Sequence, residues 1–407
     1  MYIKRNLTEA FSAANYYFPV LLLTGPRQVG KSTFLTHIAE PNRKYITLDD
    51  INLKMQAQED PQLFLRNNPP PVIIDEIQYA PELFPYIKIA VDEARRSNPL
   101  QANGLYWLTG SQQFSMMKNV SESLAGRVGV FQMHGLSLQE RMEVKKVPFL
   151  PPTCSAVPSA KFSENELYSL IWRGNYPGAK DFPDDRIGQF YNSYIQTYLE
   201  RDISALTQVA DKNTFYRFLQ AVAARQGQLL KYDSIAQDAG ISQPTARQWM
   251  NILVASGIVY LLQPYSSNLN KRLTSMPKIY MLDGGLAAYL SRWSSAEVLC
   301  AGNMNGAYFE AWCIAEILKS YWNNGEEPPV FLYRDRDKHE IDLLIEKDGC
   351  IYPVEFKKAA NIKKDDIKNF AILQKEKLKI GMGALVSMYE SDMLISEDCQ
   401  NIFAGCL

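Results

Sequence analysis

The residues with the clearest chemical signature lie in a short segment near the start of the chain. Residues 25–32 read GPRQVGKS and fit the pattern G-x-x-x-x-G-K-[ST]. Glycines let such a loop approach an anion closely, and its amides, with the N-terminus of the following helix, then face the charge. The pattern predicts a site for a nucleoside triphosphate, and we expect ATP with Mg²⁺.

The side chains of this loop have separate expected roles. Lys31 reaches the β- and γ-phosphates, and the Ser32 hydroxyl ligates Mg²⁺. The remaining residues of the expected nucleotide site are Gly25, Pro26, Arg27, Gln28, Val29, Gly30 and Thr33.

Two acidic residues follow an apolar run further along the chain. Residues 72–76 read VIIDE, which is typical of a buried strand that ends in two acids. We expect Asp75 to hold Mg²⁺ through water and Glu76 to polarise the attacking water. The alternative is a strand end with two solvated acids.

Three further residues lie where they could act on the terminal phosphate. Thr109 and Ser111 end the next apolar run, and a hydroxyl there could sense the γ-phosphate or simply form a turn. Arg127 is a candidate arginine finger, with an ordinary surface arginine as the alternative. A finger supplied in trans would imply an oligomer, which the sequence leaves open.

A second set of acids lies near the other end of the chain. Residues 340–346 (EIDLLIE) and 350–357 (CIYPVEFK) alternate as strands, and Asp348-Gly349 between them is a strong hairpin signal. Counting back from this turn places Asp342 opposite Glu355, with Cβ atoms roughly 5 Å apart.

Two carboxylates directly opposite each other are destabilising on their own. Lys357, which shares a strand face with Glu355, or a bound divalent cation must compensate. Hard cations such as Mg²⁺ prefer oxygen ligands of this kind. An exposed hairpin with a Glu–Lys ladder is the alternative.

The elements that position the nucleotide loop follow from apolar runs. Val20–Leu23, Pro71–Asp75 and Leu105–Thr109 read as strands buried on both faces, and Lys31–Glu40 has helical spacing. Strands that alternate with helices predict a parallel α/β sheet.

The middle of the chain is predicted to be helical. A proline-rich stretch at 147–158 indicates a linker, a helical region follows at 163–208 with an interruption at 174–178, and 310–321 forms a helix. Short helices around Gly240, the second capped by Ser242, indicate a helix-turn-helix.

A strand at 258–262 and a wing tip at Lys271–Arg272 would make this region a winged helix. Packing as a purely structural module is the alternative to DNA contact. If the region reads DNA, the side chains that face the groove are Gln243, Thr245, Arg247 and Gln248.

Composition excludes several classes of protein. The 407 residues carry a formal net charge of −1, which excludes a strongly basic nucleic-acid coat protein. The six cysteines form no C-x-x-C pair, so neither a zinc site nor a disulfide scaffold is expected. A polar start and the shortness of the apolar run 18–23 lead us to expect a cytoplasmic protein with no membrane partner.

Several of these segments together resemble a known family. The runs GPRQVGKST (25–33), VIIDEIQYAP (72–81), LTGSQ (108–112) and AGR (125–127) resemble bacterial and archaeal AAA-type ATPases that carry a C-terminal restriction-endonuclease-like domain. The resemblance extends through YLERD (198–202) into the last third of the chain. It implies an α/β fold with a P-loop AAA-type core, a helical lid, a winged helix and a nuclease-like end.

The C-terminal acids are similar to the core of PD-(D/E)xK nucleases through the spacing D-x(12)-E-x-K. The resemblance implies that Asp342 and Glu355 bind Mg²⁺, that Lys357 positions the attacking water, and that Glu310 is the extra acid on the preceding helix. Ile341 stands where the motif name has proline, which weakens the match.

The expected organisation is an ATPase domain at 1–150, a helical lid at 151–210, a winged helix at 211–298 and a nuclease-like domain at 299–407. In the first hypothesis, ATP turnover gates the access of DNA to the C-terminal site. In the rival hypothesis, the nucleotide state controls a protein partner and the C-terminal domain only docks. DNA and a protein therefore both remain open as partners.

Overall fold

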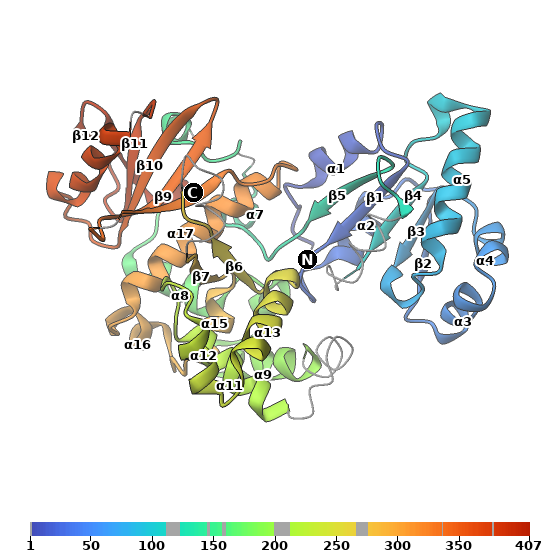
Figure 1. The fold of residues 1–407 in the computed structure, drawn as a ribbon, viewed down its shortest axis with the longest axis horizontal. Helices are drawn as coiled ribbons and strands as arrows, with labels where there is room; N and C mark the ends of the chain where they lie inside the picture. The colour runs from blue at the N-terminus through green and yellow to red at the C-terminus, as the bar shows by residue number, and fades with distance from the viewer. Residues whose placement is uncertain are drawn as a thin grey trace. The chain divides into compact units, whose positions relative to one another are not determined.

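The computed structural model describes residues 2–110, 123–144, 147–156, 160–198, 212–265, 276–335, 337–376 and 378–407 (Figure 1). Ser111 and the wing tip Lys271–Arg272 lie outside the described residues. The chain forms two compact units. The N-terminal unit contains Met1–Gly135, Ala255–Gly257 and Trp322–Glu326, and the C-terminal unit contains the remainder. The division into four regions stays a prediction.

The N-terminal unit is built on a parallel sheet of five strands in the order β2-β3-β4-β1-β5. Val20 pairs with Tyr106 on one side and with Val128 on the other, so β1 lies inside the sheet. All residues of β1 are buried, as an apolar run covered on both faces requires. This confirms the predicted parallel α/β sheet. The strands are β1 (Val20–Thr24), β2 (Lys44–Thr47), β3 (Val72–Asp75), β4 (Tyr106–Thr109) and β5 (Val128–Gln132).

Helices pack on this sheet through apolar faces. In α5, residues spaced three and four apart are buried in one core cluster with the strand residues (Leu83, Phe84, Ile87 and Val91). Aspartates start two neighbouring helices, because Asp50 and Asp60 accept hydrogen bonds from free amides of the first turns. The helices are α1 (Thr8–Ala14), α2 (Lys31–Ile38), α3 (Ile51–Glu59), α4 (Pro61–Asn67) and α5 (Leu83–Ser97), with short 3₁₀ turns at Ile77–Tyr79 and Pro99–Gln101.

The C-terminal unit begins with helical segments. Ser163 and Glu166 form a reciprocal cap at the start of α8, and Gly174 ends that helix with φ of 75°. The helices are α7 (Leu138–Arg141), α8 (Glu164–Arg173), α9 (Ile187–Tyr198), α11 (Lys212–Ala223), α12 (Tyr232–Ala239), α13 (Gln243–Ala255), α15 (Gly284–Leu290) and α16 (Ala296–Ala301), with 3₁₀ turns at Pro151–Ala156, Pro177–Asp181 and Asp184–Arg186.

The predicted helix–turn–helix spacing is present in this unit. Gly240 ends α12 with φ of 70°, and the Ser242 hydroxyl accepts from the Thr245 amide at 3.2 Å at the start of α13. Two antiparallel strands follow, β6 (Val259–Leu262) and β7 (Lys278–Met281).

The last part of the chain is a mixed sheet of six strands in the order β12-β13-β11-β10-β9-β8, with α17 (Asn305–Trp322) before it in sequence. Strands β9 to β12 and α17 are labelled in Figure 1. Asp348 and Gly349 both have positive φ, 52° and 73°, as a two-residue hairpin turn demands. The strands are β8 (Val330–Arg334), β9 (Glu340–Lys347), β10 (Cys350–Lys357), β11 (Gly383–Ser387), β12 (Leu394–Ser396) and β13 (Cys399–Phe403), with 3₁₀ segments at Lys364–Glu376 and Ala404–Cys406.

Among the described residues, no helix combines the length and the apolar character that a membrane crossing needs.

Candidate nucleotide site and a partly buried acidic cluster

The loop between β1 and α2 has a backbone that only glycine tolerates at two positions. Gly30 has φ of 92° immediately before the first residue of α2. Gly25 has φ of 136°, and a Cβ atom there would lie 2.0 Å from the Met133 carbonyl oxygen. The two glycines of the sequence pattern are therefore required by the shape of the loop.

Lys31 is the first residue of α2, directly after this loop, and is 7% exposed. Its ammonium donates to the carbonyl oxygens of Gly25 at 2.9 Å and Pro26 at 2.8 Å. The loop thus holds one buried positive charge at the N-terminus of α2, where an anion is stabilised.

Arg5 fixes the same loop from the outside, and sequence reasoning missed it. Its guanidinium donates to the carbonyl oxygens of Val29 at 2.9 Å and His134 at 2.6 Å, and its side chain is buried. A single arginine near the start of a chain has no pattern that would reveal this role.

Asp75, at the end of β3, accepts hydrogen bonds from hydroxyl groups on three elements. The Ser32 hydroxyl lies 2.8 and 3.0 Å from its two carboxylate oxygens, and the Tyr45 hydroxyl donates at 2.7 Å. The Thr109 hydroxyl also donates to Asp75. Burial, followed by the hydrogen bond to Asp75, raises the pKa of Tyr45. The structure therefore brings together the two residues predicted to hold Mg²⁺, Ser32 and Asp75.

Glu76 follows Asp75 in a left-handed conformation, with φ of 58°. Such a backbone is costly for a residue other than glycine and is concentrated at functional sites. The Glu76 amide donates to the Thr109 hydroxyl at 3.2 Å, and its carboxylate accepts from the Gln78 side chain. Thr109 thus connects the two acids, and its predicted role as a phosphate sensor stays a prediction.

Arg127 forms a bidentate ion pair with Asp92 on α5. Its Nε and Nη2 atoms lie 2.7 and 3.0 Å from the two carboxylate oxygens. Hydrogen bonding to Arg127 lowers the pKa of Asp92. An arginine-finger role would require Arg127 to leave this pair, and it stays a prediction.

The acids predicted in the C-terminal hairpin do lie together. The register runs from Cys350↔Lys347 to Val354↔Leu343, as counted from the sequence. The Phe356 amide donates to Asp342 Oδ2 at 3.1 Å. Burial raises the pKa of Glu355, and repulsion by Asp342 raises it further.

Two more acids join this pair to form a partly buried acidic cluster, defined by Glu310, Glu340, Asp342 and Glu355. Glu310 comes from α17, as expected, and Glu340 lies two residues before Asp342 on β9. Burial, followed by repulsion from Asp342, raises the pKa of Glu310. The cluster therefore needs a positive charge.

Lys278 on β7 supplies that charge. Its ammonium lies 2.6 Å from Glu340 Oε1, 3.1 Å from Glu310 Oε1 and 3.8 Å from Asp342 Oδ1, and its side chain is 6% exposed. Burial works against its charge, but the neighbouring carboxylates outweigh this and raise the pKa of Lys278. Tyr280, two residues further along β7, also hydrogen-bonds to Glu310.

The sequence pointed to Lys357 or a bound cation as the compensating charge. The structure places Lys278 beside the acids and pairs Lys357 with Asp366, while the bound cation stays a prediction. The Lys357 ammonium lies 2.6 Å from Asp366 Oδ1, and its side chain is 48% exposed. Lys357 is at the last position of β10, where Asp366 is a nearby acceptor. The signals that could have found the actual residues are a lysine opening the apolar run KIYM and the period of two that puts Glu340 beside Asp342.

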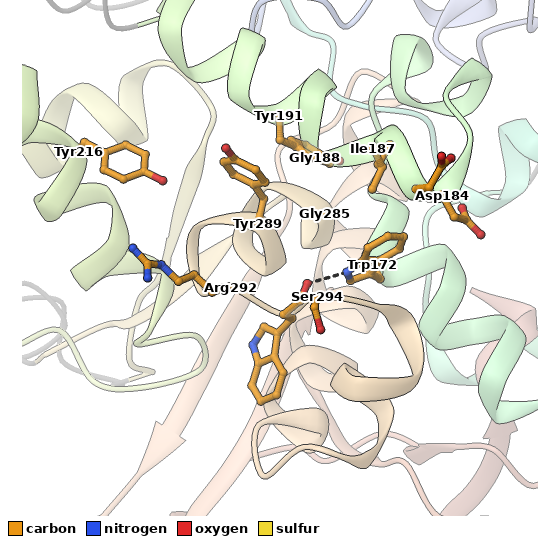
Figure 2. A pocket seen from close by; sticks show the side chains of 12 residues that line it. Trp172, Asp184, Ile187, Gly188, Tyr191, Tyr216, Gly285, Tyr289, Arg292 and Ser294 are labelled. Carbon is orange, nitrogen blue, oxygen red and sulfur yellow. Dashed lines mark hydrogen bonds between the residues drawn. The ribbon is translucent and has the colours of Figure 1, made fainter.

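The C-terminal unit also has a pocket of about 520 Å³ with an aromatic lining (Figure 2). The rings of Tyr191 and Tyr289 stack with centroids 6.1 Å apart, and the Trp172 indole donates to the Trp293 carbonyl at 2.8 Å. In these contacts the aromatic rings pack α8, α9 and the segment that contains α15 against one another.

Three parts of the chain match known families. Residues 17–142 match the AAA domain. Residues 164–297 and 305–404 match two domains of unknown function, DUF8612 and DUF4143. The first match and the loop geometry together support a P-loop ATPase domain of the AAA type in residues 17–142.

Similar proteins include two uncharacterized mycobacterial proteins, from Mycobacterium tuberculosis and Mycobacterium bovis. Both are 29% identical to this chain over 365 residues, which cover 88% of this chain and 74% of each relative. The Walker-type ATPase PABY2304 of Pyrococcus abyssi is similar in structure, with a TM-score of 0.41, 15% identity, and coverage of 70% of this chain and 94% of that chain.

Proposed function

We propose that this chain is a Mg²⁺-dependent ATPase whose nucleotide state controls its C-terminal domain. The observation that carries the ATPase part is the contact of the Ser32 hydroxyl with both oxygens of Asp75, beside the loop that holds Lys31. These oxygen donors suit Mg²⁺, and the loop amides and Lys31 suit the phosphates. The bound metal would neutralise phosphate charge.

Glu76 is the residue that polarises the attacking water in this proposal. Its left-handed backbone turns it away from the strand direction of β3, and Thr109 holds its amide. Arg127 is the candidate finger, and acting in trans it would require a second copy of the chain.

Two substitutions test the ATPase part. Lys31→Ala removes the buried ammonium, and we expect ATP affinity to fall by about 100-fold. Glu76→Gln retains shape but removes the base, and we expect ATP to bind normally while turnover falls about 10²–10⁴-fold. Binding is measured by calorimetry and turnover by phosphate release. Normal turnover in Glu76→Gln would contradict the assigned role.

As a control, Lys368→Ala removes an exposed lysine of the C-terminal unit, which is paired with Asp365 on the same segment. We expect this variant to bind and hydrolyse ATP as the wild type does.

We further propose that the C-terminal unit contains a winged helix and a restriction-endonuclease-like domain, and that the controlled partner is DNA. The proposal is supported by the helix–turn–helix spacing and the two-stranded ribbon after it. Gln243 and Arg247 line a pocket of about 700 Å³ together with Lys231, and the Arg247 guanidinium lies 4.3 Å from the Tyr232 ring centroid. Thr245 and Gln248 complete the set of side chains proposed to face DNA.

One observation favours the second candidate, a nucleotide-dependent switch that acts on a protein through a non-catalytic C-terminal domain. The lysine expected to act in catalysis, Lys357, is paired with Asp366, while Lys278 occupies the acidic cluster. In this alternative Asp342, Glu355 and Glu310 stabilise the fold and cut no DNA.

A further inference from the structure

Lys278 is anchored at its position from both sides of its strand. It pairs with Leu262 in the β6–β7 ribbon and forms a bridge with Leu229 on its other side. Tyr280 shares its strand face and bonds to the same acid, Glu310. Backbone pairing therefore fixes where the Lys278 side chain begins, and its carboxylate partners and 6% exposure hold the ammonium in place.

The Lys278 ammonium contacts the same carboxylate oxygens that would ligate a metal ion. Two of its three carboxylate partners, Glu310 and Asp342, are acids to which the nuclease resemblance gives a role in binding Mg²⁺. An ammonium and a divalent cation repel each other and compete for the same carboxylate oxygens. The donor atoms suit a metal, but the ammonium of Lys278 already occupies the position between them.

We propose that Lys278 is the resident cation of the acidic cluster, and that a divalent cation binds there only when Lys278 is removed or withdrawn. The inference rests on the proposed function only for the identity of the metal-binding acids, Glu310, Asp342 and Glu355. It makes the β6–β7 ribbon, which lies outside the nuclease-like sheet, the part of the chain that determines whether this site holds metal.

The charge balance explains why removal would create a metal site. Lys278 pairs with three of the four carboxylates, and of these three only Glu340 has a second ion-pair partner among the described residues. Lys278→Met therefore leaves Glu310 and Asp342, which are partly buried, without their ion-pair partner. A divalent cation would then restore part of the balance through oxygen ligands. Tyr280 and the hairpin register would still hold Glu310, Asp342 and Glu355 in place.

The test measures Mn²⁺ binding to the full chain, without nucleotide, by electron paramagnetic resonance. We expect no saturable site at the acidic cluster of the wild type. We expect Lys278→Met to gain one site, with affinity at least about tenfold tighter than any wild-type binding there. Asp342→Asn added to Lys278→Met should abolish the gain, which locates the ion in the cluster.

Lys278→Met could unfold the cluster, and a second variant avoids this outcome. Lys278→Met combined with Glu340→Gln removes one positive and one negative charge and keeps the three acids assigned to metal. Glu340 also pairs with Arg334 at 3.0 Å, and that arginine is partly exposed to solvent. Circular dichroism checks that this double variant is folded, and we expect it to gain the Mn²⁺ site as well.

Two controls complete the design. Lys357→Met removes the lysine named by the sequence motif and should create no site, and Lys278→Arg should retain the wild-type behaviour. The proposal is overturned if the wild type already binds Mn²⁺ in a way that Asp342→Asn abolishes. It is also overturned if the folded double variant gains no site. Neither result would affect the ATPase proposal, which Lys31→Ala and Glu76→Gln test separately.

Discussion

At the scale of single residues, the nucleotide site depends on hydroxyl groups around one carboxylate. Ser32 belongs to the loop pattern, and Thr109 ends an apolar run in the sequence, but Tyr45 comes from β2 and has no motif. All three donate to Asp75. The acid predicted to bind metal is therefore positioned by residues that a sequence pattern reveals only in part.

Tyr45→Phe tests this positioning. Loss of the hydroxyl removes one hydrogen bond to Asp75, and the 41% exposure of Tyr45 lets water replace part of it. We expect the Mg²⁺ concentration for half-maximal ATPase activity to rise by about two- to tenfold, with little change in kcat at saturating Mg²⁺. Tyr86→Phe, at a similarly exposed tyrosine on α5, is the control. An unchanged Mg²⁺ dependence would remove Tyr45 from the site.

At the scale of elements, the loop after β1 is held in place by backbone geometry. Gly25 packs against the carbonyl group of Met133, the residue that follows β5, so the loop and the neighbouring strand must fit each other. Glycine is therefore needed at position 25 for the contact between two elements as well as for the approach of a phosphate.

Gly25→Ala tests this contact. The new Cβ would lie 2.0 Å from the Met133 oxygen, at a φ that alanine disfavours. We expect ATP binding to be lost and the free energy of unfolding to fall by about 2 kcal/mol. Denaturant titration and calorimetry measure the two effects.

Gly306→Ala is the matched control, because Gly306 lies in α17 with open space around its Cβ position. We expect its stability to stay within about 1 kcal/mol of the wild type, and to rise if it changes. Equal losses in the two variants would show that the contact with Met133 is unimportant.

At the scale of the whole molecule, the open question is which partner responds to ATP. The winged-helix proposal predicts that DNA raises the rate of ATP hydrolysis, and that Arg247→Ala reduces this effect while basal turnover is unchanged. Phosphate release with and without duplex DNA measures both. If the rate of ATP hydrolysis is the same with and without DNA at every DNA length and concentration, the protein-directed switch is favoured.

DNA cleavage is a separate arm of the same question. If the acidic cluster cuts DNA, Mg²⁺-dependent nicking by the wild type should disappear in Asp342→Ala while ATP hydrolysis persists. Absence of nicking in the wild type would agree with Lys278 as the resident cation and with a non-catalytic C-terminal domain.

The sequence by itself determined the features set by neighbouring residues. The phosphate loop, the buried strands beside it and the Asp348-Gly349 turn depend on local backbone preferences, and the hairpin register follows from that turn by counting. For this reason Asp342 and Glu355 could be placed opposite each other without a structure.

Only the tertiary structure decided which charge neutralises those acids and which residues support the loop. Lys278 lies 64 positions before Asp342 in the printed numbering, and Arg5 lies 129 positions before its acceptor His134. Such partners meet because distant segments pack together, and the periodicity of residues within one segment cannot predict that packing. The motif therefore named Lys357, while the fold brought Lys278 to the acids.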